Sequence, residues 1–463
     1  MLTARRLSVR IAMTLLYWGC CAVALAQPAG KTEARPEALR LMLRAADVVA
    51  VKEFYGPATE TKASFEVVAK AVLSPQGPLV GKLTAFEEQR FFAYALGETG
   101  LSWASPPDGS GAGPALLRRF WFLKPSVFVI DDRVCPAPSA PLRWSLEVQG
   151  RPEPGPRPVR AKQGAWEVVC TSLLPEQAGQ TRFLHVLEVR GEGEPSAPAK
   201  AELFRADGVL QVTVRTPDRT FQLWLPEGAD SAGKIAVAQP DGGALLERRP
   251  LPSGILPHGP EGSALLERWD ASYRGGRRAA WDTGRPSSDL KKAVEQGILR
   301  PCRALELGCG TGTNAIYLAS KGFDVTAIDI APTALNLAQD KARQAGAKVR
   351  WLLADVLHPP QLEPFDLIYD RGCYHGVRRQ NAAGYVEAVC RLSRPGTRLL
   401  ILAGNANETA RGGPPRVKEE ELRADFSERF QFEWLRQTHF DTFDADARGA
   451  LAWSILLRRK GEQ

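Results

Sequence analysis

Several patterns that would fix the class of a protein at once are missing from this sequence. Its 463 residues include 8 Cys and 5 His, but no C-x-x-C pair and no His/Cys cluster, so nothing indicates a metal site. No repeat with a period of about 20 to 50 residues, the signature of solenoids and propellers, is visible. Lys and Arg exceed Asp and Glu by a net charge of +8, yet they are scattered along the chain. This distribution predicts a solvated surface and no nucleic-acid partner.

Long apolar runs are also absent, except at the N-terminus. Three arginines precede an apolar run over residues 11–26, which ends in Ala24-Leu25-Ala26. A basic start, a short apolar core and an A-x-A exit are typical of a secretory signal. The run is shorter than the about 20 residues of a transmembrane helix. An uncleaved anchor with membrane contact through residues 11–26 remains an alternative. We therefore expect an exported, periplasmic or anchored protein, or a cytoplasmic one if the true start lies downstream.

The composition then divides the chain into regions. Residues 27–250 hold short alternating apolar segments, such as 127–131, 183–189 and 221–225, separated by Gly and Pro. Such segments predict an antiparallel β-sandwich. Residues 251–262 are rich in Gly and Pro and are predicted to be a linker. Residues 263–463 are predicted to form a second domain.

Part of the β-rich region resembles a known sandwich. Segments 119–125, 127–131 and 183–186 resemble the C-terminal β-sandwich of heparinase II/III-like polysaccharide lyases. The resemblance implies a sandwich fold but no lyase activity, because the chain has no room for the helical toroid that carries the catalytic groups. Aromatic residues on these strands suggest glycan contact, and His185 is either a strand residue or part of such a surface.

The second domain is organised around one glycine-rich stretch. The apolar segment 303–307 leads into Glu306-x-Gly308-x-Gly310-x-Gly312, and residues 314–319 have helical spacing. Strand, glycine turn and helix form the arrangement of a nucleotide site in a doubly wound α/β sheet. Glycine permits a sharp turn and lets a ligand approach the backbone. The spacing differs from the G-x-G-x-x-G of pyrophosphate sites, so it suits a ligand without phosphate.

Two acids follow at the ends of the next predicted strands. Asp329 closes segment 325–328, where it is placed to accept ribose hydroxyls, and Asp355 closes segment 350–354, where an adenine amino group is expected. This set resembles the S-adenosylmethionine (SAM) site of class I methyltransferases. The resemblance implies SAM as cofactor, no metal, and contacts at Trp281, Glu306, Gly308, Cys309, Gly310, Gly312, Asp329, Ile330, Asp355, Val356 and Asp370.

Two further segments narrow the resemblance. Segments 280–286 and 412–417 resemble thiopurine S-methyltransferase-like enzymes, a group that includes tellurite, thiol and halide methyltransferases. The resemblance implies that Trp281 covers the methionine part of the cofactor and that the Gly-Pro-Pro loop borders the acceptor pocket. Arg416 stands where many members have an aromatic residue. A cation there favours an anionic or polarisable acceptor.

The catalytic candidates follow the predicted central strand. Asp370, Tyr374 and His375 lie at the carboxyl end of segment 364–370, where residues of a parallel sheet line the ligand crevice. His375 is either a base for a thiol or hydroxyl or a polar wall of the pocket. The expected activity is methyl transfer to a small molecule with a thiol, an oxyanion or a similar soft nucleophile. The alternative is an envelope glycan-binding protein with a non-catalytic methyltransferase-like domain.

Overall fold

The computed structural model describes the C-terminal half of the chain almost completely and the N-terminal half in part. The described residues are 81–100, 115–135 except 125, 144–147, 151–153, 159–163, 166–174, 182–191, 198–226 and 232–461 except 277, 445 and 446, together with the strand segments 11–12, 42–45, 48–55, 62–65 and 68–71. The predicted signal or anchor thus lies outside them, apart from segment 11–12. Export and membrane contact through residues 11–26 stay predictions from the sequence.

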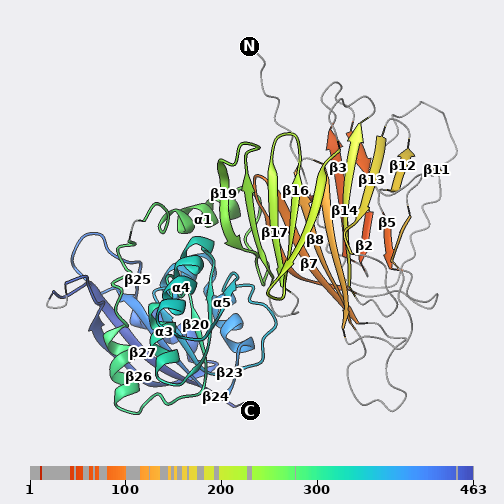
Figure 1. Cartoon of the computed structure of the whole chain (residues 1–463). Coiled ribbons are helices and arrows are strands. Elements are labelled where there is room, and N and C mark those ends of the chain that lie inside the picture. Colours follow the sequence, from red (N-terminus) through yellow and green to blue (C-terminus); the bar gives the residue numbers. More distant parts are fainter. Residues whose placement is uncertain are drawn as a thin grey trace. The chain divides into compact units, whose positions relative to one another are not determined.

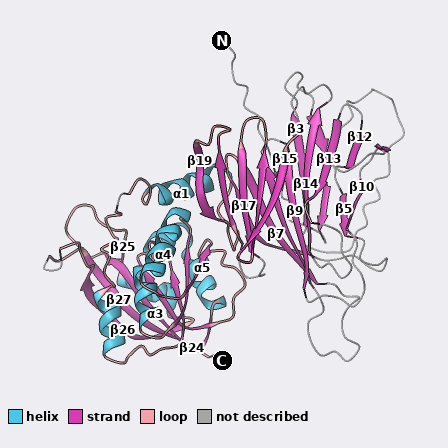
Figure 2. Cartoon of the chain, viewed as in Figure 1, coloured by secondary structure: helices cyan, strands magenta, loops and turns pink. Residues whose placement is uncertain are grey.

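The chain divides into two compact units. One comprises Met1–Leu83, Arg90–Leu203 and Thr213–Thr220; the other comprises Thr84–Gln89, Phe204–Val212 and Phe221–Gln463. The second unit therefore includes segments that the sequence analysis placed in the β-rich region. In the part of the chain that the structure describes, helices occur only after residue 258 (Figure 2).

Antiparallel strands dominate the chain before residue 200. An eight-stranded sheet has the order β11-β12-β13-β14-β9-β8-β7-β6, and its pairs from β11 to β7 are antiparallel. Its strands are β6 (Gly81–Glu88), β7 (Phe92–Gly100), β8 (Ala115–Leu123), β9 (Val127–Cys135), β11 (Arg151–Glu153), β12 (Val159–Gln163), β13 (Trp166–Ser172) and β14 (Arg182–Gly191). Smaller sheets comprise β1 (Ile11–Ala12), β2 (Met42–Ala45), β3 (Val48–Tyr55) and β4 (Lys62–Phe65), and β5 (Val68–Ala71) with β10 (Trp144–Glu147). The predicted antiparallel β-structure is confirmed; its packing as a sandwich stays a prediction.

His185 can be placed within this sheet. It lies on β14, only 7% exposed, and its Nδ1 is 3.1 Å from the hydroxyl oxygen of Ser172. Burial lowers its pKa to about 4, with a smaller contribution from Arg118. The side chain therefore belongs to the sheet interior, which favours the structural interpretation over a glycan contact.

A five-stranded sheet precedes the helices. Its order is β15 (Lys200–Ala206), β16 (Val209–Arg215), β17 (Thr220–Pro226), β18 (Lys234–Ala238) and β19 (Ala244–Pro250). Within the second unit this sheet contacts helix α4 (Pro332–Gln344), because Asn336 donates to the Arg248 carbonyl at 2.8 Å and Lys234 donates to Gln339 at 2.8 Å. The strands just before residue 250 thus pack on the α/β part of the chain.

The segment predicted as a linker is also packed. Leu251 and Leu256 are each 1% exposed, the Ser253 amide donates to the Leu353 carbonyl at 2.8 Å, and helix α1 (Gly259–Ala271) already begins at Gly259. Residues 251–262 are therefore a packed part of the second unit and do not form an exposed linker. Gly and Pro serve here to turn the backbone between packed elements rather than to separate domains.

The C-terminal part is a doubly wound α/β domain, as predicted. Its sheet has the order β22-β21-β20-β23-β24-β27-β26, parallel from β22 to β24, with β25 beside β24 and β27 antiparallel to it. The strands are β20 (Arg303–Leu307), β21 (Asp324–Asp329), β22 (Val349–Leu353), β23 (Phe365–Arg371), β24 (Ser393–Asn405), β25 (Arg416–Val417), β26 (Phe430–His439) and β27 (Leu451–Arg459). The remaining helices are α2 (Ser288–Glu295), α3 (Thr313–Ser320), α5 (Tyr374–Arg391) and α6 (Glu419–Phe426) (Figure 1).

Apolar residues on β20 alternate between two cores. Leu305 and Leu307 pack with residues of α5 and α6, whereas Ala304 packs with residues of α2 and α3. Because successive strand residues point to opposite faces, helices cover both faces of the sheet. This leaves the carboxyl ends of the strands as the open edge where a ligand can enter.

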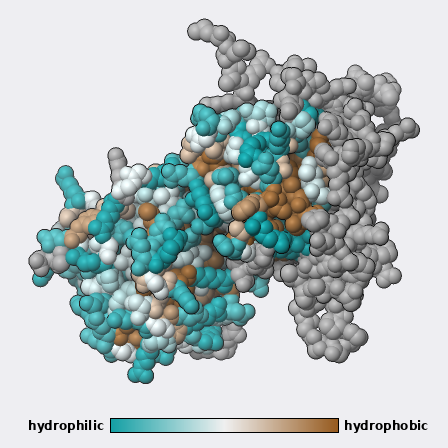
Figure 3. Space-filling view, in the orientation of Figure 1, coloured by the Kyte–Doolittle hydropathy of each residue, from teal (hydrophilic) through white to brown (hydrophobic). Residues whose placement is uncertain are grey.

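The surface of this domain is mostly hydrophilic or intermediate, with scattered apolar residues (Figure 3). Among the described residues the exposed large apolar side chains are Phe204, Trp281, Leu337 and Phe443. None of the described helices is both long and apolar enough to span a membrane.

Gly312 illustrates how tightly the glycine-rich loop after β20 is enclosed. Its φ is +77°, and a Cβ there would lie 2.3 Å from the Trp351 ring. We expect Gly312→Ala to lower the free energy of unfolding by about 2–4 kcal/mol, because backbone strain and overpacking add. Gly346, with φ +62° and open space where a Cβ would lie, is the matched control. Gly346→Ala should cost only about 1 kcal/mol in urea unfolding followed by tryptophan fluorescence; equal losses would contradict the enclosure.

Candidate functional site

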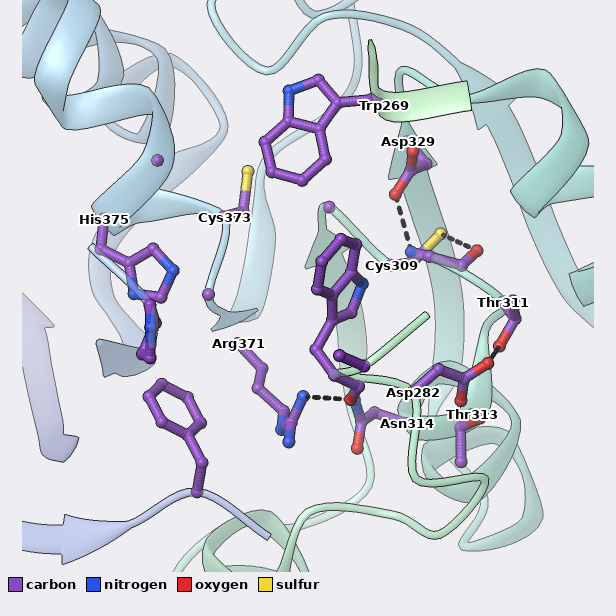
Figure 4. Close-up of a pocket in the computed structure, with 18 of the residues that line it drawn as sticks. Trp269, Asp282, Cys309, Thr311, Thr313, Asn314, Asp329, Arg371, Cys373 and His375 are labelled. Atoms are coloured by element: carbon purple, nitrogen blue, oxygen red, sulfur yellow. Dashed lines mark hydrogen bonds between the residues drawn. The ribbon is translucent and has the colours of Figure 1, made fainter. Parts of the chain in front are cut away.

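A cavity of about 640 Å³ opens at the carboxyl ends of β20, β21 and β23. Ten of the predicted site residues line it: Trp281, Glu306, Gly308, Cys309, Gly310, Asp329, Ile330, Asp355, Val356 and His375. Figure 4 shows that Asp329, Cys309 and Thr311 lie on one side of the cavity, and that Cys373 and His375 lie across from them. We call the part of the cavity beside Asp329, Cys309 and Thr311 the first half, and the part beside Cys373 and His375 the second half.

The floor of the first half is bare backbone. Gly308 and Gly310 have φ of +63° and +53°. A Cβ at Gly308 would lie 2.6 Å from the Cβ of Cys373, and one at Gly310 would lie 3.1 Å from the Tyr273 hydroxyl oxygen. Glycine is required here both for the left-handed turn and for the close approach of the neighbouring segments.

Glu306 is a buried carboxyl in this half. Asn314 donates to its Oε1 at 3.1 Å, whereas Oε2 is buried and has no hydrogen-bond partner among the described residues. Burial raises the pKa of Glu306 to about 8. A buried acceptor without a partner is costly, so this oxygen is suited to a cationic or hydrogen-bond-donating ligand.

Asp329 and Asp355 provide two further carboxylates. Asp329 accepts hydrogen bonds from the amides of Gly310, at 2.7 Å, and Ala331, at 2.8 Å, and burial raises its pKa to about 6. Asp355 accepts from the Leu357 amide at 3.0 Å. Backbone amides thus fix both carboxylates at the ends of their strands, as predicted, with Ile330 and Val356 beside them on the cavity wall.

The segment around Trp281 closes this half from outside. The Trp281 indole donates to the Tyr273 hydroxyl at 3.0 Å, and Arg371 donates to the Trp281 carbonyl at 3.1 Å. Asp282 accepts from the hydroxyl of Thr311 at 2.6 Å, which ties the segment to the glycine loop. Trp281 itself remains 44% exposed, as a covering residue would.

The second half is apolar and aromatic, with few polar groups. His375 and Arg371 lie here, and the ring of Phe440 lies edge-on to His375 at 6.1 Å and under the Arg371 guanidinium at 5.4 Å. Other lining residues are Leu265, Trp269, Val377, Gly413, Pro414, Pro415, Phe443 and Ala450. The Gly-Pro-Pro loop thus borders this half, as the sequence resemblance implied.

The amide of Gly404 donates to Nδ1 of His375 at 3.0 Å. The neutral ring must therefore carry its proton on Nε2, since Nδ1 acts as acceptor. Burial, with a contribution from Arg371, lowers the pKa of His375 to about 4, so the ring is neutral near pH 7. His375 is then a hydrogen-bond donor at Nε2, which corrects its interpretation as a base.

Asp370 and Tyr374 do not line the cavity, contrary to the prediction. Asp370 is fully buried and accepts from the amides of Cys373 and Tyr374 and from the Tyr385 hydroxyl, so it caps helix α5. The hydroxyl of Tyr374 donates to Asp425 at 2.5 Å on the opposite side of the helix. Both residues lie next to the strand end, as predicted, but their side chains are buried in the core and do not reach the cavity.

Two other predictions also need correction. Gly312 does not line the cavity; it is the residue before α3 and packs against Trp351. Arg416 does not line it either, because its guanidinium donates to the carbonyls of Glu408, Ala410 and Gly412. The cation near the second half is instead Arg371.

The sequence analysis missed Tyr273, Arg371 and Phe440 as site residues. Arg371 ends the predicted central strand, so its place at the sheet edge was a usable signal. Tyr273 and Phe440 follow α1 and β26, and only the folded chain brings them to this edge. No group of three His, Cys, Asp or Glu able to hold a metal occurs in the described part of the chain.

Comparison with known proteins gives consistent matches for this domain. A methyltransferase domain family matches residues 304–396. A 2-heptyl-1-hydroxyquinolin-4(1H)-one methyltransferase of Mycobacteroides abscessus is 31% identical over 169 residues, covering 34% of this chain and 74% of that protein. A probable thiol methyltransferase of Arabidopsis thaliana is 32% identical over 149 residues, covering 32% of this chain and 65% of that protein. A solved structure reported for the conversion of a disulfide bond into a thioacetal group during echinomycin biosynthesis is 28% identical, covers 43% of this chain and 94% of that chain, and has a TM-score of 0.38.

The buried carboxyl of Glu306 makes a testable contribution to stability. Its pKa is about 8 in the folded protein against an ordinary 4.5, so the folded state keeps a proton that the unfolded state has lost. The resulting stability is present below about pH 4.5 and is lost as the pH rises toward 8. We compare the free energy of unfolding in urea of the ligand-free protein with that of Glu306→Gln. Between about pH 6.5 and 8, the free energy of the unsubstituted protein should fall relative to the variant by up to about 1.4 kcal/mol per pH unit.

The exposed Glu420 on α6 provides the control for this titration. Glu420→Gln should keep the pH dependence of the unsubstituted protein. Parallel stability curves for the unsubstituted protein and Glu306→Gln across this pH range would show that Glu306 is not held protonated by burial.

Proposed function

This chain belongs to the S-adenosylmethionine-dependent methyltransferases, and from this premise we propose that it methylates a small molecule at a thiolate, an oxyanion or a similar soft nucleophile. The 31% identity to a relative of which 74% is covered supports the family. The two halves of the cavity support the choice of acceptor.

The first half has the groups that SAM requires. We assign the unpaired Oε2 of Glu306 to the ammonium group of the cofactor, Asp329 to the ribose hydroxyls and Asp355 with Val356 to the adenine. The glycine floor lets the cofactor lie against the backbone. Trp281 covers the methionine part, in keeping with the resemblance to thiopurine S-methyltransferase-like enzymes.

One observation carries the proposal for the acceptor. In the described second half, the lining groups include a neutral His375 whose Nδ1 already accepts a hydrogen bond, and the Arg371 cation. Among the acids lining the cavity, Asp282 is held by Thr311 and Asp441 by the Ser288 amide. One oxygen of each of these carboxylates is already engaged, and His375 has no free lone pair, which favours acceptors that ionise readily, such as acidic thiols and hydroxyls.

When bound, SAM supplies both the methyl group and the sulfonium leaving group, so transfer to an ionised acceptor moves no proton to or from the protein. The residues of this chain hold the acceptor in line, exclude water and place positive charge near its nucleophile. Such alignment can be worth about 7–11 kcal/mol. The hydroxyquinolinone and the thiol for which two relatives are named are acceptors of this acidic kind.

The proposed cofactor site is tested by the affinity of the full chain for S-adenosylhomocysteine (SAH), the demethylated cofactor. We expect Asp329→Ala to weaken SAH binding at least about 10-fold in calorimetric titration, because charge-assisted hydrogen bonds to the ribose are lost. Asp340→Ala is the control, since Asp340 is exposed on α4 and outside the cavity. Unchanged affinity in Asp329→Ala would place the ribose elsewhere.

The proposed acceptor is tested with SAM and a panel of thiophenols, phenols and aliphatic alcohols. We expect methylated products, detected by mass spectrometry, from acceptors that ionise near neutral pH. Their rates should rise with acidity until the acceptor is fully ionised at the assay pH, because a still more acidic acceptor gives a weaker nucleophile. Aliphatic alcohols should give no product because nothing in the cavity removes their proton. Preferred methylation of an aliphatic alcohol would overturn the proposal.

A further inference from the structure

The orientation of His375 is fixed by the sheet rather than by its own helix. Its Nδ1 accepts from the Gly404 amide, and Gly404 lies on β24 in register with Arg416 of β25 and Ala452 of β27. A Cβ at Gly404 would lie 2.1 Å from the Pro415 carbonyl oxygen, so the amide has little room to move. The tautomer of His375 is thus set by a rigid backbone donor.

This arrangement presents Nε2–H toward the cavity. His375 lines the cavity, and the described hydrogen bonds engage only its Nδ1. A Cβ at Gly372, another lining residue, would lie 3.5 Å from Nε2. Because the lone pair at Nδ1 is already engaged, the ring has no free lone pair with which to take a proton from an acceptor.

The surroundings favour a flat ring with a negative charge. Phe440 lies edge-on to His375, and Phe443 and Trp269 also line the cavity. Ionisable groups that line the cavity near His375 include Arg371 at the end of β23, Cys373 after β23 and Asp441 after β26. Burial raises the pKa of the Cys373 thiol well above its usual range, so this thiol stays neutral, and Asp441 already accepts from the Ser288 amide. Arg371, whose guanidinium lies over the Phe440 ring, therefore places a positive charge beside His375, and Arg285 is a second cation on the cavity wall.

We propose that His375 is the residue that selects the ionised acceptor: its Nε2–H donates to an anionic oxygen or sulfur on a planar aromatic ring, while Arg371 balances the charge. The inference rests on the proposed function and narrows its acceptor to acidic hydroxy- and mercapto-aromatic compounds. His375 thereby holds the nucleophile in its reactive form and in position, and it takes up no proton.

The test uses the full chain saturated with SAH and two chromophoric probes, 4-nitrophenol and 4-nitrothiophenol. The ionised and neutral forms of each probe absorb at different wavelengths, so absorbance reports ionisation in the pocket directly. We expect the bound probes to ionise at a pH about one unit or more below that of the free probes, because a donor and a cation stabilise the anion. A bound probe that ionises at the same or a higher pH would overturn the proposal.

Two substitutions distinguish a hydrogen bond donated by Nε2 of His375 to the acceptor from a purely structural role of this side chain. His375→Asn keeps an acceptor for the Gly404 amide but has no donor at the reach of Nε2, so we expect weaker probe binding, by about 10-fold, and a smaller shift in ionisation. His375→Gln keeps an amide donor near that position and should retain most of the shift. Both variants should bind SAH normally, which shows that they fold. Equal loss in both variants, or no loss in His375→Asn, would overturn the donor role.

Replacing SAH with SAM distinguishes this inference from the proposed function. Probes that ionise in the pocket through His375 but are never methylated would leave the donor role in place and refute transfer to such acceptors. Methylation without a His375-dependent shift would refute the donor role alone. If neither probe binds, the aromatic acceptor class is wrong.

Discussion

The close approach of backbone segments around the glycine loop is the constraint on which the site depends. Gly308 lies against Cys373 and Gly312 against Trp351, so the loop after β20 is enclosed by β22 and by the turn after β23. Parallel pairing brings the carboxyl ends of these strands to one edge, and glycine at these positions lets the neighbouring segments approach the loop closely. The acids at those ends then face a common space, and the bare loop leaves room for a ligand beside them.

The cavity separates charges along its length. One half holds the buried carboxyl groups of Glu306 and Asp329, and burial raises the pKa of both because a charge there is poorly solvated. The other half combines the Arg371 cation with a neutral donor at His375. The proposed anionic acceptor would meet the cation and the donor of the second half, and these groups are already held in place before it binds.

The cover of the cavity is held by contacts to both halves. Trp281 contacts Tyr273 through its indole and Arg371 through its carbonyl, and Asp282 contacts Thr311 of the glycine loop. The segment that closes the cofactor half is therefore joined to the cation of the acceptor half. Closure of one half and the position of Arg371 in the other depend on the same hydrogen bonds.

The sequence by itself determined the features that depend on local backbone geometry. The sequence alone predicts the glycine turn and the alternation of strands and helices. It also predicts Asp329 and Asp355 at strand ends, because each of these features follows from a few consecutive residues. Only the tertiary structure decided what Asp370, Tyr374, His375 and Arg416 do. Asp370 caps a helix, Arg416 binds nearby carbonyls, and the tautomer of His375 is set by Gly404, which lies 29 residues further along the chain. The amide partners of Asp370 and the carbonyl partners of Arg416 lie nearby in the sequence, but their side-chain directions are set by the folded backbone. The acceptor of the Tyr374 hydroxyl and the donor to His375 lie 51 and 29 residues away, and no local pattern encodes such contacts.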